Sequence, residues 1–308
     1  MSNKTIPLIG YSDRFSGRPG EKINFKVSSD NKSPFKASLF KCISADPNPK
    51  GMGIIEKSEK KFFPTQTFKS RKQNFYPGSY AISVKNFEAT FDYGFKVDLN
   101  IFPTLINKNK QTIFHINNAE LFINENGLIC FKYMNRKINL SNPVKVNHWY
   151  KIEFGCNKSS KSIFLKLFSI NSQISKLVSE KYTEAENKDI NLHGKICIAA
   201  QYNNSFATNF FNGKIEDPKI FSFSANSEID LYAGWKFSEN ISSTHVTDLN
   251  DKEMNLKLIN YPTRAVTGSN WDGSEMSWKH AKEQYSAIHF HEDDIYDFEW
   301  ENDFDFVV

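Results

Sequence analysis

Polar and apolar residues alternate along most of the chain with the period of two that is typical of half-buried β-strands. Segment 22–28 alternates in this way after a turn that contains Pro19 and Gly20, and segment 35–42 is predicted as its partner. Segment 80–84 follows a second Pro-Gly turn. The N-terminal part of the chain is therefore expected to consist of short strands joined by turns.

A longer series of alternating segments begins near residue 87. Segment 91–102 places six apolar residues on one predicted face: Phe91, Tyr93, Phe95, Val97, Leu99 and Ile101. Further strands are predicted at 111–116, 119–123, 128–133, 149–155, 162–169, 195–200 and 213–221, and a terminal strand at 303–308. The only helix candidate is 277–285. This pattern predicts an all-β fold of the sandwich or barrel type.

The order of motifs after residue 89 is informative. His148-Trp149-Tyr150 opens an alternating strand that ends at Gly155, and 211–215 leads into 219–221. This succession resembles laminin-G-like (concanavalin A-like) jelly rolls over residues 89–224. We expect an immunoglobulin-like β-sandwich unit in 1–88, completed by 228–308, with the laminin-G/concanavalin A-like jelly roll of 89–224 as an insertion.

Charge is distributed unevenly along the chain. The net charge is +4, yet no Lys or Arg follows Lys282, and residues 283–308 hold nine carboxylates. The first 282 residues therefore carry a net charge of +13. Because these lysines are scattered, we favour a solvated basic surface, on which the acidic tail can dock, over nucleic-acid binding.

The cysteines and apolar runs indicate the compartment. The four cysteines show no CxxC spacing and lie in or beside apolar runs, as buried free thiols do: Cys42, Cys130, Cys156 and Cys197. The first residues lack a secretory signal, and no apolar run approaches the roughly 20 residues of a membrane span. We expect a cytoplasmic protein with no membrane partner.

The C-terminal region carries the strongest resemblance to a known family. Its distinctive motifs are YPTRAVTGSNWDGSEM at 261–276, EQYSAIHFHEDD at 283–294 and the acidic, aromatic run 296–304. Segments 9–14 and 46–49 fit the same family. Together these motifs resemble the large (beta) subunit of N,N-dimethylformamidase, over the whole chain and most specifically at 260–304.

The resemblance implies an amidohydrolase that cleaves a formamide into formate and an amine. It also implies a mononuclear iron, held by two tyrosines and a glutamate in a C-terminal α/β domain. We expect this chain to end before that domain, so no catalytic residue or iron ligand is assigned here. The implied partners are a catalytic domain or polypeptide of the same family and a small subunit, in an oligomer, and the chain alone is expected to be inactive.

Three residues near the C-terminus have the spacing of metal ligands. On a strand, His289, His291 and Asp293 share one face. The competing interpretation is a polar segment that packs against the catalytic domain, with hydrogen-bonded histidines. We favour the second interpretation, because the iron implied by the resemblance belongs elsewhere.

A second candidate is the turn that contains Asn270, Trp271 and Asp272. These residues either face the active site of the complete enzyme or form an interface, or they build a structural Asx-turn. Both interpretations stay open. Ser12 as a nucleophile is disfavoured, because no histidine or other base lies near it in the sequence.

Two classes of function compete. The first is a non-catalytic scaffold and interface portion of an N,N-dimethylformamidase-like amidohydrolase. The second is a free-standing laminin-G-like module that binds carbohydrate or protein through exposed aromatic residues: Tyr202, Phe206, Phe210 and Phe211. An independent metalloenzyme centred on His289 and His291 is the least favoured.

Overall fold

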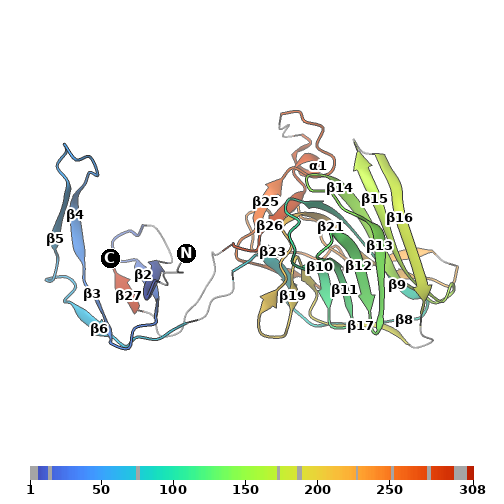
Figure 1. Cartoon of the computed structure of the whole chain (residues 1–308), viewed down its shortest axis with the longest axis horizontal. Helices are drawn as coiled ribbons and strands as arrows, with labels where there is room; N and C mark the ends of the chain where they lie inside the picture. The colour runs from blue at the N-terminus through green and yellow to red at the C-terminus, as the bar shows by residue number, and fades with distance from the viewer. Residues whose placement is uncertain are drawn as a thin grey trace. The chain divides into compact units, whose positions relative to one another are not determined.

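The computed structural model describes residues 6–12, 16–73, 77–171, 174–185, 189–226, 228–250, 253–275, 279–294 and 304–308. It divides the chain into two units, one formed by Met1–Phe75 with Phe298–Val308 and the other by Tyr76–Asp297. Every pairing between described strands is antiparallel, and the single helix, α1 (Ala281–Gln284), has four residues. The predicted all-β fold is confirmed (Figure 1).

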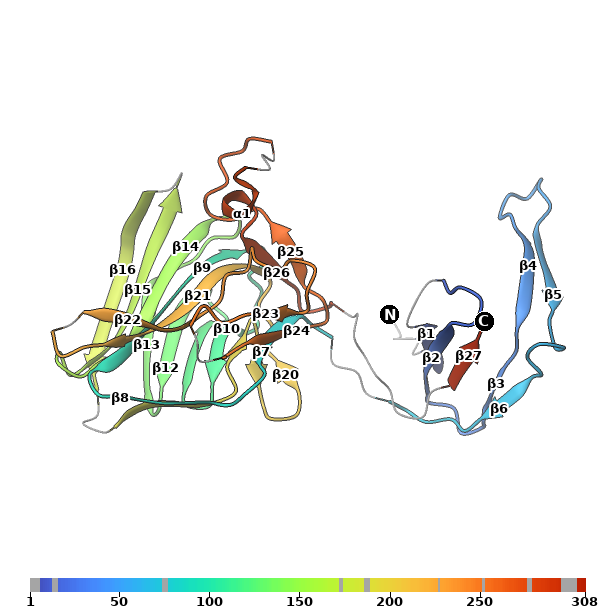
Figure 2. The ribbon, with the colours of Figure 1, turned by 180° about the vertical axis from the view of Figure 1, so that it is seen from behind.

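The larger unit contains two extended sheets that face each other (Figure 2). The strands of the first sheet, in spatial order, are β13 (Arg136–Pro143), β12 (Leu128–Tyr133), β11 (Ala119–Ile123), β10 (Gln111–Ile116), β18 (Cys197–Ile198), β7 (Tyr80–Ser83), β24 (Leu256–Ile259) and β23 (His245–Val246). Every residue of β10 and β11, in the middle of this sheet, is buried.

The second sheet carries the site described below. Its strands, in spatial order, are β16 (Ile174–Glu184), β15 (Ser162–Asn171), β14 (Trp149–Asn157), β9 (Gly94–Pro103), β21 (Gly213–Phe223), β26 (Ala287–Phe290) and β25 (Thr263–Val266), with β22 (Ile229–Gly234) paired to β21. Two short pairs complete the unit: β17 (Ile190–Gly194) with β8 (Phe87–Phe91), and β19 (Gln201–Tyr202) with β20 (Ala207–Thr208).

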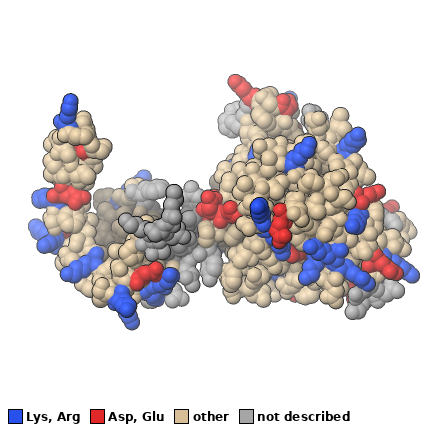
Figure 3. All heavy atoms as spheres, viewed as in Figure 1, with Lys and Arg blue, Asp and Glu red and all other residues tan. Residues whose placement is uncertain are grey.

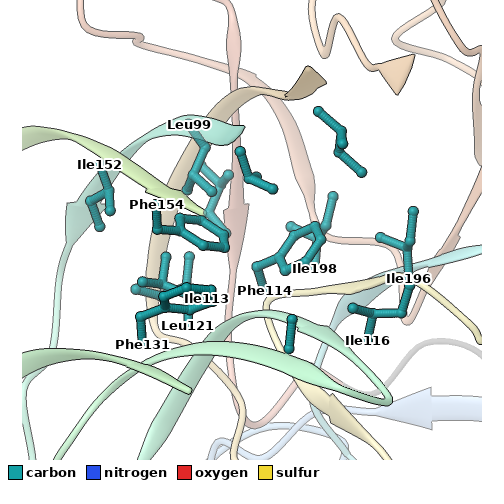
Figure 4. Close-up of a cluster of buried hydrophobic side chains, with 14 of the residues drawn as sticks. Leu99, Ile113, Phe114, Ile116, Leu121, Phe131, Ile152, Phe154, Ile196 and Ile198 are labelled. Atoms are coloured by element: carbon teal, nitrogen blue, oxygen red, sulfur yellow. The ribbon is translucent and has the colours of Figure 1, made fainter. Parts of the chain in front are cut away.

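The hydrophobic core lies between the two sheets (Figure 4). Phe154 on β14 meets Phe131 on β12 and Phe114 on β10, with ring centroids 4.8 and 5.6 Å apart. The three rings are almost completely buried, so they join the layers through apolar contact. Along β9 the buried residues alternate as predicted, but the predicted strand 91–102 is interrupted by a turn, and Tyr93 is 40% exposed.

The smaller unit is built from ribbons of two or three strands. One sheet has the order β1 (Leu8–Ser12), β2 (Lys22–Ser29) and β27 (Phe304–Val307), so the predicted terminal strand is confirmed. β4 (Phe40–Ala45) and β5 (Ile54–Ser58) form a hairpin, and the flanking strands β3 (Phe35–Ala37) and β6 (Gln66–Phe68) pair with each other. Cys42 on β4 is exposed, contrary to prediction, because this hairpin has no second layer to cover it; the other three cysteines are buried.

The predicted boundaries differ from this division. We expected 228–308 to complete a unit begun by 1–88, but strands β22 to β26 pair with the sheets of the sandwich, and so does β7. β22 and β26 both pair with β21 and so belong to the second sheet. Of the predicted segment 228–308, only the terminal strand β27 pairs with β2. Of the helix predicted at 277–285, the four residues of α1 form, while Ser277 lies outside the described residues. α1, the one helix in the described ranges, is far too short to cross a membrane.

Candidate functional site

A polar groove of about 430 Å³ lies on the second sheet of the sandwich. Side chains of both charges line it, together with amides and hydroxyl groups. We call this site the polar groove and define it by Asp98, Leu99, Asn100, Lys151, Ile170, Ser175, Glu216, Asp217, Lys219, Lys236, Ser269, Asn270, Lys282, Glu283 and Ser286. Its volume is within the range of small-molecule sites, and none of the described residues that line it is aromatic.

Strand alternation brings the floor of the groove together. On β9, Val97, Leu99 and Ile101 are buried in the core, so Asp98 and Asn100 emerge on the opposite face. On β21 the register shifts between Glu216 and Lys219, which marks a β-bulge that contains Pro218. Asp217 in this bulge has a φ of 39°, a conformation that is uncommon outside glycine, and its side chain lines the groove.

Glu216 holds one wall of the groove in place. It is 4% exposed, and its carboxylate accepts hydrogen bonds from Asn100 Nδ2 at 2.8 Å and from the backbone N–H of Ser269 at 3.3 Å. The hydroxyl groups of Ser269 and Ser286 also donate to it. A buried carboxylate requires such donors, so Glu216 fastens the loop that begins at Gly268 onto the sheet.

Two carboxyl groups in the groove titrate abnormally. Burial raises the pKa of Asp98, although Lys96 Nζ at 3.4 Å and Lys151 Nζ at 4.0 Å oppose this effect. Burial likewise raises the pKa of Asp217 to about 6, against a hydrogen bond of 3.0 Å that its Oδ1 accepts from the backbone N–H of Phe237. Asp217 can therefore exchange a proton close to neutral pH.

The predicted turn at 270–272 lies at the rim of this groove. Asn270 lines the groove, whereas Trp271 is 44% exposed and donates from Nε1 to the Ser274 carbonyl at 3.0 Å. Asp272 accepts the backbone N–H of Ser274 at 2.9 Å, and the Ser274 hydrogen bonds hold the pKa of Asp272 below its usual range. The Asx-turn is therefore present, and the same turn delivers Asn270 to the groove. Met276 and Trp278 lie outside the described residues.

The predicted histidine pair lies outside the groove. The rings of His289 on β26 and His291 just beyond it have centroids 4.0 Å apart. Burial lowers the pKa of His289 to about 4, assisted by the nearby His291 and Lys214, and its Nε2 lies 3.3 Å from Thr104 Oγ1. His291 is held through its backbone, which exchanges hydrogen bonds with Ser79. A neutral His289 fits a hydrogen-bonded, half-buried environment.

Asp293 does not complete a metal site with these histidines. It is exposed in a turn after β26, and the described ranges contain no group of three or more His, Cys, Asp or Glu side chains that could hold a metal ion. The residues described therefore do not fit the iron that the sequence resemblance implies.

The aromatic surface expected for a free-standing binding module does not form as predicted. Phe211 is fully buried in the core, and Tyr202, Phe206 and Phe210 are each half-buried. Tyr202 and Phe210 pack with Tyr80 against Cys197, Ala200 and Ala207. These residues therefore build a small secondary core.

Sequence reasoning missed most of the polar groove, namely Asp98, Glu216, Asp217 and Lys219. The signal that could have indicated them is the run Glu216-Asp217-Pro218-Lys219, which interrupts an otherwise alternating strand with charges and a proline. Proline in the middle of a sheet indicates a bulge or an edge.

These features define an all-β sandwich protein with a polar, mixed-charge groove on one sheet. The particular resemblance is to the N,N-dimethylformamidase beta subunit. The chain is 29% identical to that subunit from Alcaligenes sp and 28% identical to the one from Paracoccus aminophilus, in each case over 99% of this chain and 46% of the relative. It thus spans about half the length of the curated relatives it matches.

No family model matches the chain. Among solved structures, a candidate carbohydrate-binding protein from Bacteroides ovatus is similar, with a TM-score of 0.41 and 11% identity over 77% of this chain and 66% of that one. A heptameric SAP-like pentraxin from Limulus polyphemus has a TM-score of 0.34 and 12% identity over 48% of this chain and 71% of that one.

Proposed function

We propose that this chain is the non-catalytic, N-terminal scaffold and interface portion of an N,N-dimethylformamidase-like amidohydrolase. In that enzyme a formamide C–N bond would be hydrolysed to formate and an amine by residues outside this chain. The observation that carries the proposal is the resemblance to the two beta subunits, which extends over 99% of this chain but only 46% of each relative.

Three further points concern the separation of this scaffold portion from the catalytic part of the enzyme. The proposal assigns the iron that the family resemblance implies to another domain or polypeptide, and the described residues offer no metal-binding cluster. The relatives are named beta subunits, which supports an assembly with a different subunit. Exposed apolar side chains on the smaller unit, such as Phe40 and Ile54, are suited to a protein interface.

The test is an assay of formate release from N,N-dimethylformamide, made in parallel on the 308-residue chain and on protein purified from its native source. The N,N-dimethylformamidase of Paracoccus aminophilus serves as the positive control. We expect no formate from the chain alone, and an active native preparation that contains iron and additional polypeptide by intact mass. Formate release by the chain alone, or a native protein of 308 residues without an amidohydrolase partner, would contradict the proposal.

A further inference from the structure

Four lysines and four carboxylates line the polar groove, but they are not paired one to one. Lys96 and Lys151 both approach Asp98, at 3.4 and 4.0 Å, and Lys151 reaches Glu153 at 2.8 Å. On the opposite wall, Lys236 and Lys282 share a single carboxylate, that of Glu239, at 3.9 and 3.2 Å. Among the described residues, some lysines of the groove therefore share a carboxylate or have none within 4 Å.

Lys219 is the clearest case. It is half-buried on β21, directly opposite Asp98 on β9, and it lines the groove. In the part of the chain that the structure describes, its ammonium group makes no ion pair within 4 Å and no hydrogen bond, and its charge acts on Asp98 and Asp217 only at a longer distance. An ammonium group that is partly removed from water is stabilised when an anion fills its hydrogen-bonding positions.

The carboxylates of the groove are occupied elsewhere. Glu216 accepts its hydrogen bonds from Asn100, Ser269 and Ser286, and Glu283 lies 3.4 Å from His280 Nδ1. Asp217 accepts the backbone N–H of Phe237 at 3.0 Å. Asn270 is exposed at the rim of the groove, and its amide makes no hydrogen bond to another described residue, so it is accessible to a ligand.

We propose that the polar groove binds a small oxyanion, a carboxylate or a phosphate group, with Lys219 as the charged anchor and Asn270 as an amide donor. Lys219 supplies a strong, charge-assisted hydrogen bond, and the volume of about 430 Å³ admits a ligand larger than the anion itself. This site does not depend on whether the chain belongs to an amidohydrolase.

The test is a titration of the ¹⁵N-labelled 308-residue chain with inorganic phosphate and, separately, with acetate, at constant ionic strength. We expect saturable amide shifts at 98–100, 216–219 and 269–270, with a dissociation constant on the order of 1 mM for a single anchored anion. Tighter binding of phosphate would assign the site to phosphate groups, and tighter binding of acetate to carboxylates.

Variants make the test specific. Lys219→Gln should weaken binding about tenfold, the effect of losing one charge-assisted hydrogen bond. Lys219→Arg should retain binding, and so should Lys257→Gln, which removes an exposed lysine from β24 of the other sheet. Thermal unfolding verifies that each variant is folded. Shifts that never saturate with either anion, or equal affinity in the wild type and a folded Lys219→Gln variant, would overturn the proposal.

Discussion

The sandwich and the smaller unit use the same element, the antiparallel strand, with opposite results. The sandwich stacks two sheets and buries large side chains completely, among them Phe114, Phe131 and Phe154. Among the described residues of the smaller unit, Phe63 is the only buried apolar side chain. A strand gains little hydrophobic stabilisation unless a second layer covers it, because two-stranded ribbons are marginal in water.

The smaller unit also differs in charge and in its surface. The smaller unit carries fifteen Lys and Arg, all in residues 1–75, against ten Asp and Glu, six in 1–75 and four in 298–308, and basic side chains project from the face of this unit that Figure 3 shows. On the hairpin β4–β5, Phe40 is 51% and Ile54 73% exposed, and Lys41 is directly opposite Lys57. Paired like charges and exposed apolar residues both disfavour an isolated hairpin. This comparison indicates that the sandwich covers its own apolar surface, whereas the hairpin of the smaller unit leaves apolar side chains exposed.

The largest expected effect is in the sandwich core. Phe154→Ala should lower the free energy of unfolding by about 3–5 kcal/mol, because it removes a fully buried ring and leaves a cavity between the sheets. Urea unfolding followed by tryptophan fluorescence measures the change. A loss below about 1 kcal/mol would show that the two sheets are not held together by this contact.

The second largest effect on stability is expected at Glu216, whose hydrogen bonds hold one wall of the groove. Glu216→Ala should lower the free energy of unfolding by about 2–3 kcal/mol, because it leaves the buried donors of Asn100, Ser269 and Ser286 without an acceptor. Hydrogen exchange of the amides at 268–275 should accelerate. The matched control is Glu125→Ala, at an exposed position of the same sandwich, and equal exchange in both variants would contradict the anchoring role.

A smaller effect is expected from Asp217, whose titration makes the free energy of unfolding depend on pH. Its pKa is raised from 3.8 to about 6 by burial, so the folded state binds this proton more tightly than the unfolded state. Its contribution to stability is therefore present below about pH 4 and is lost as the pH rises through about 6.

Asp217→Asn removes this titration and keeps an acceptor for the Phe237 N–H, and asparagine tolerates the positive φ. Relative to wild type, the variant should be more stable at pH 7 than at pH 4 by about 1–3 kcal/mol, measured by urea unfolding at both values. The charged groups that act on Asp217 are Glu216, Lys219 and Lys236. A difference that does not change with pH would show that Asp217 is not perturbed by burial.

The smallest effect should be on the hairpin. Phe40→Ala should change the free energy of unfolding by less than about 0.5 kcal/mol, because the ring is half exposed and contributes little burial. Measured beside Phe154→Ala, it sharpens the contrast between the two units. If its cost approached that of the core substitution, the hairpin would be covered in solution, and the smaller unit would resemble the sandwich.

Several strands were predictable because they are short apolar or alternating segments bounded by turn residues. Segments 111–116, 119–123 and 128–133 coincide with β10, β11 and β12, and the predicted 149–155 with most of β14. The edge strand β16 was not predicted. It is exposed over most of its length, with a register shift opposite Leu167 and Phe168, so no face of it carries an apolar pattern.

Only part of the candidate site could be predicted from the sequence. The turn at 270–272 was recognised because Asn, Asp and Gly have local conformational preferences that act over a few residues. Its relation to Glu216 was not, because the hydrogen bonds between Ser269 and Glu216 join positions 53 residues apart. The histidine spacing predicted a shared face correctly, since the rings are 4.0 Å apart, but spacing alone could not bring Asp293 to them.

The alternation of apolar residues determined the all-β class and most strand positions, because a strand's side-chain period is local and burial of one face selects it. The motifs near the C-terminus likewise indicated the resemblance to the dimethylformamidase beta subunit by their residues alone. The tertiary structure decided which strands are neighbours, and therefore that 229–290 belongs to the sandwich and that β9, β14 and β21 meet in a groove. Pairing partners are selected by the summed burial and hydrogen bonding of distant segments, which no local pattern encodes.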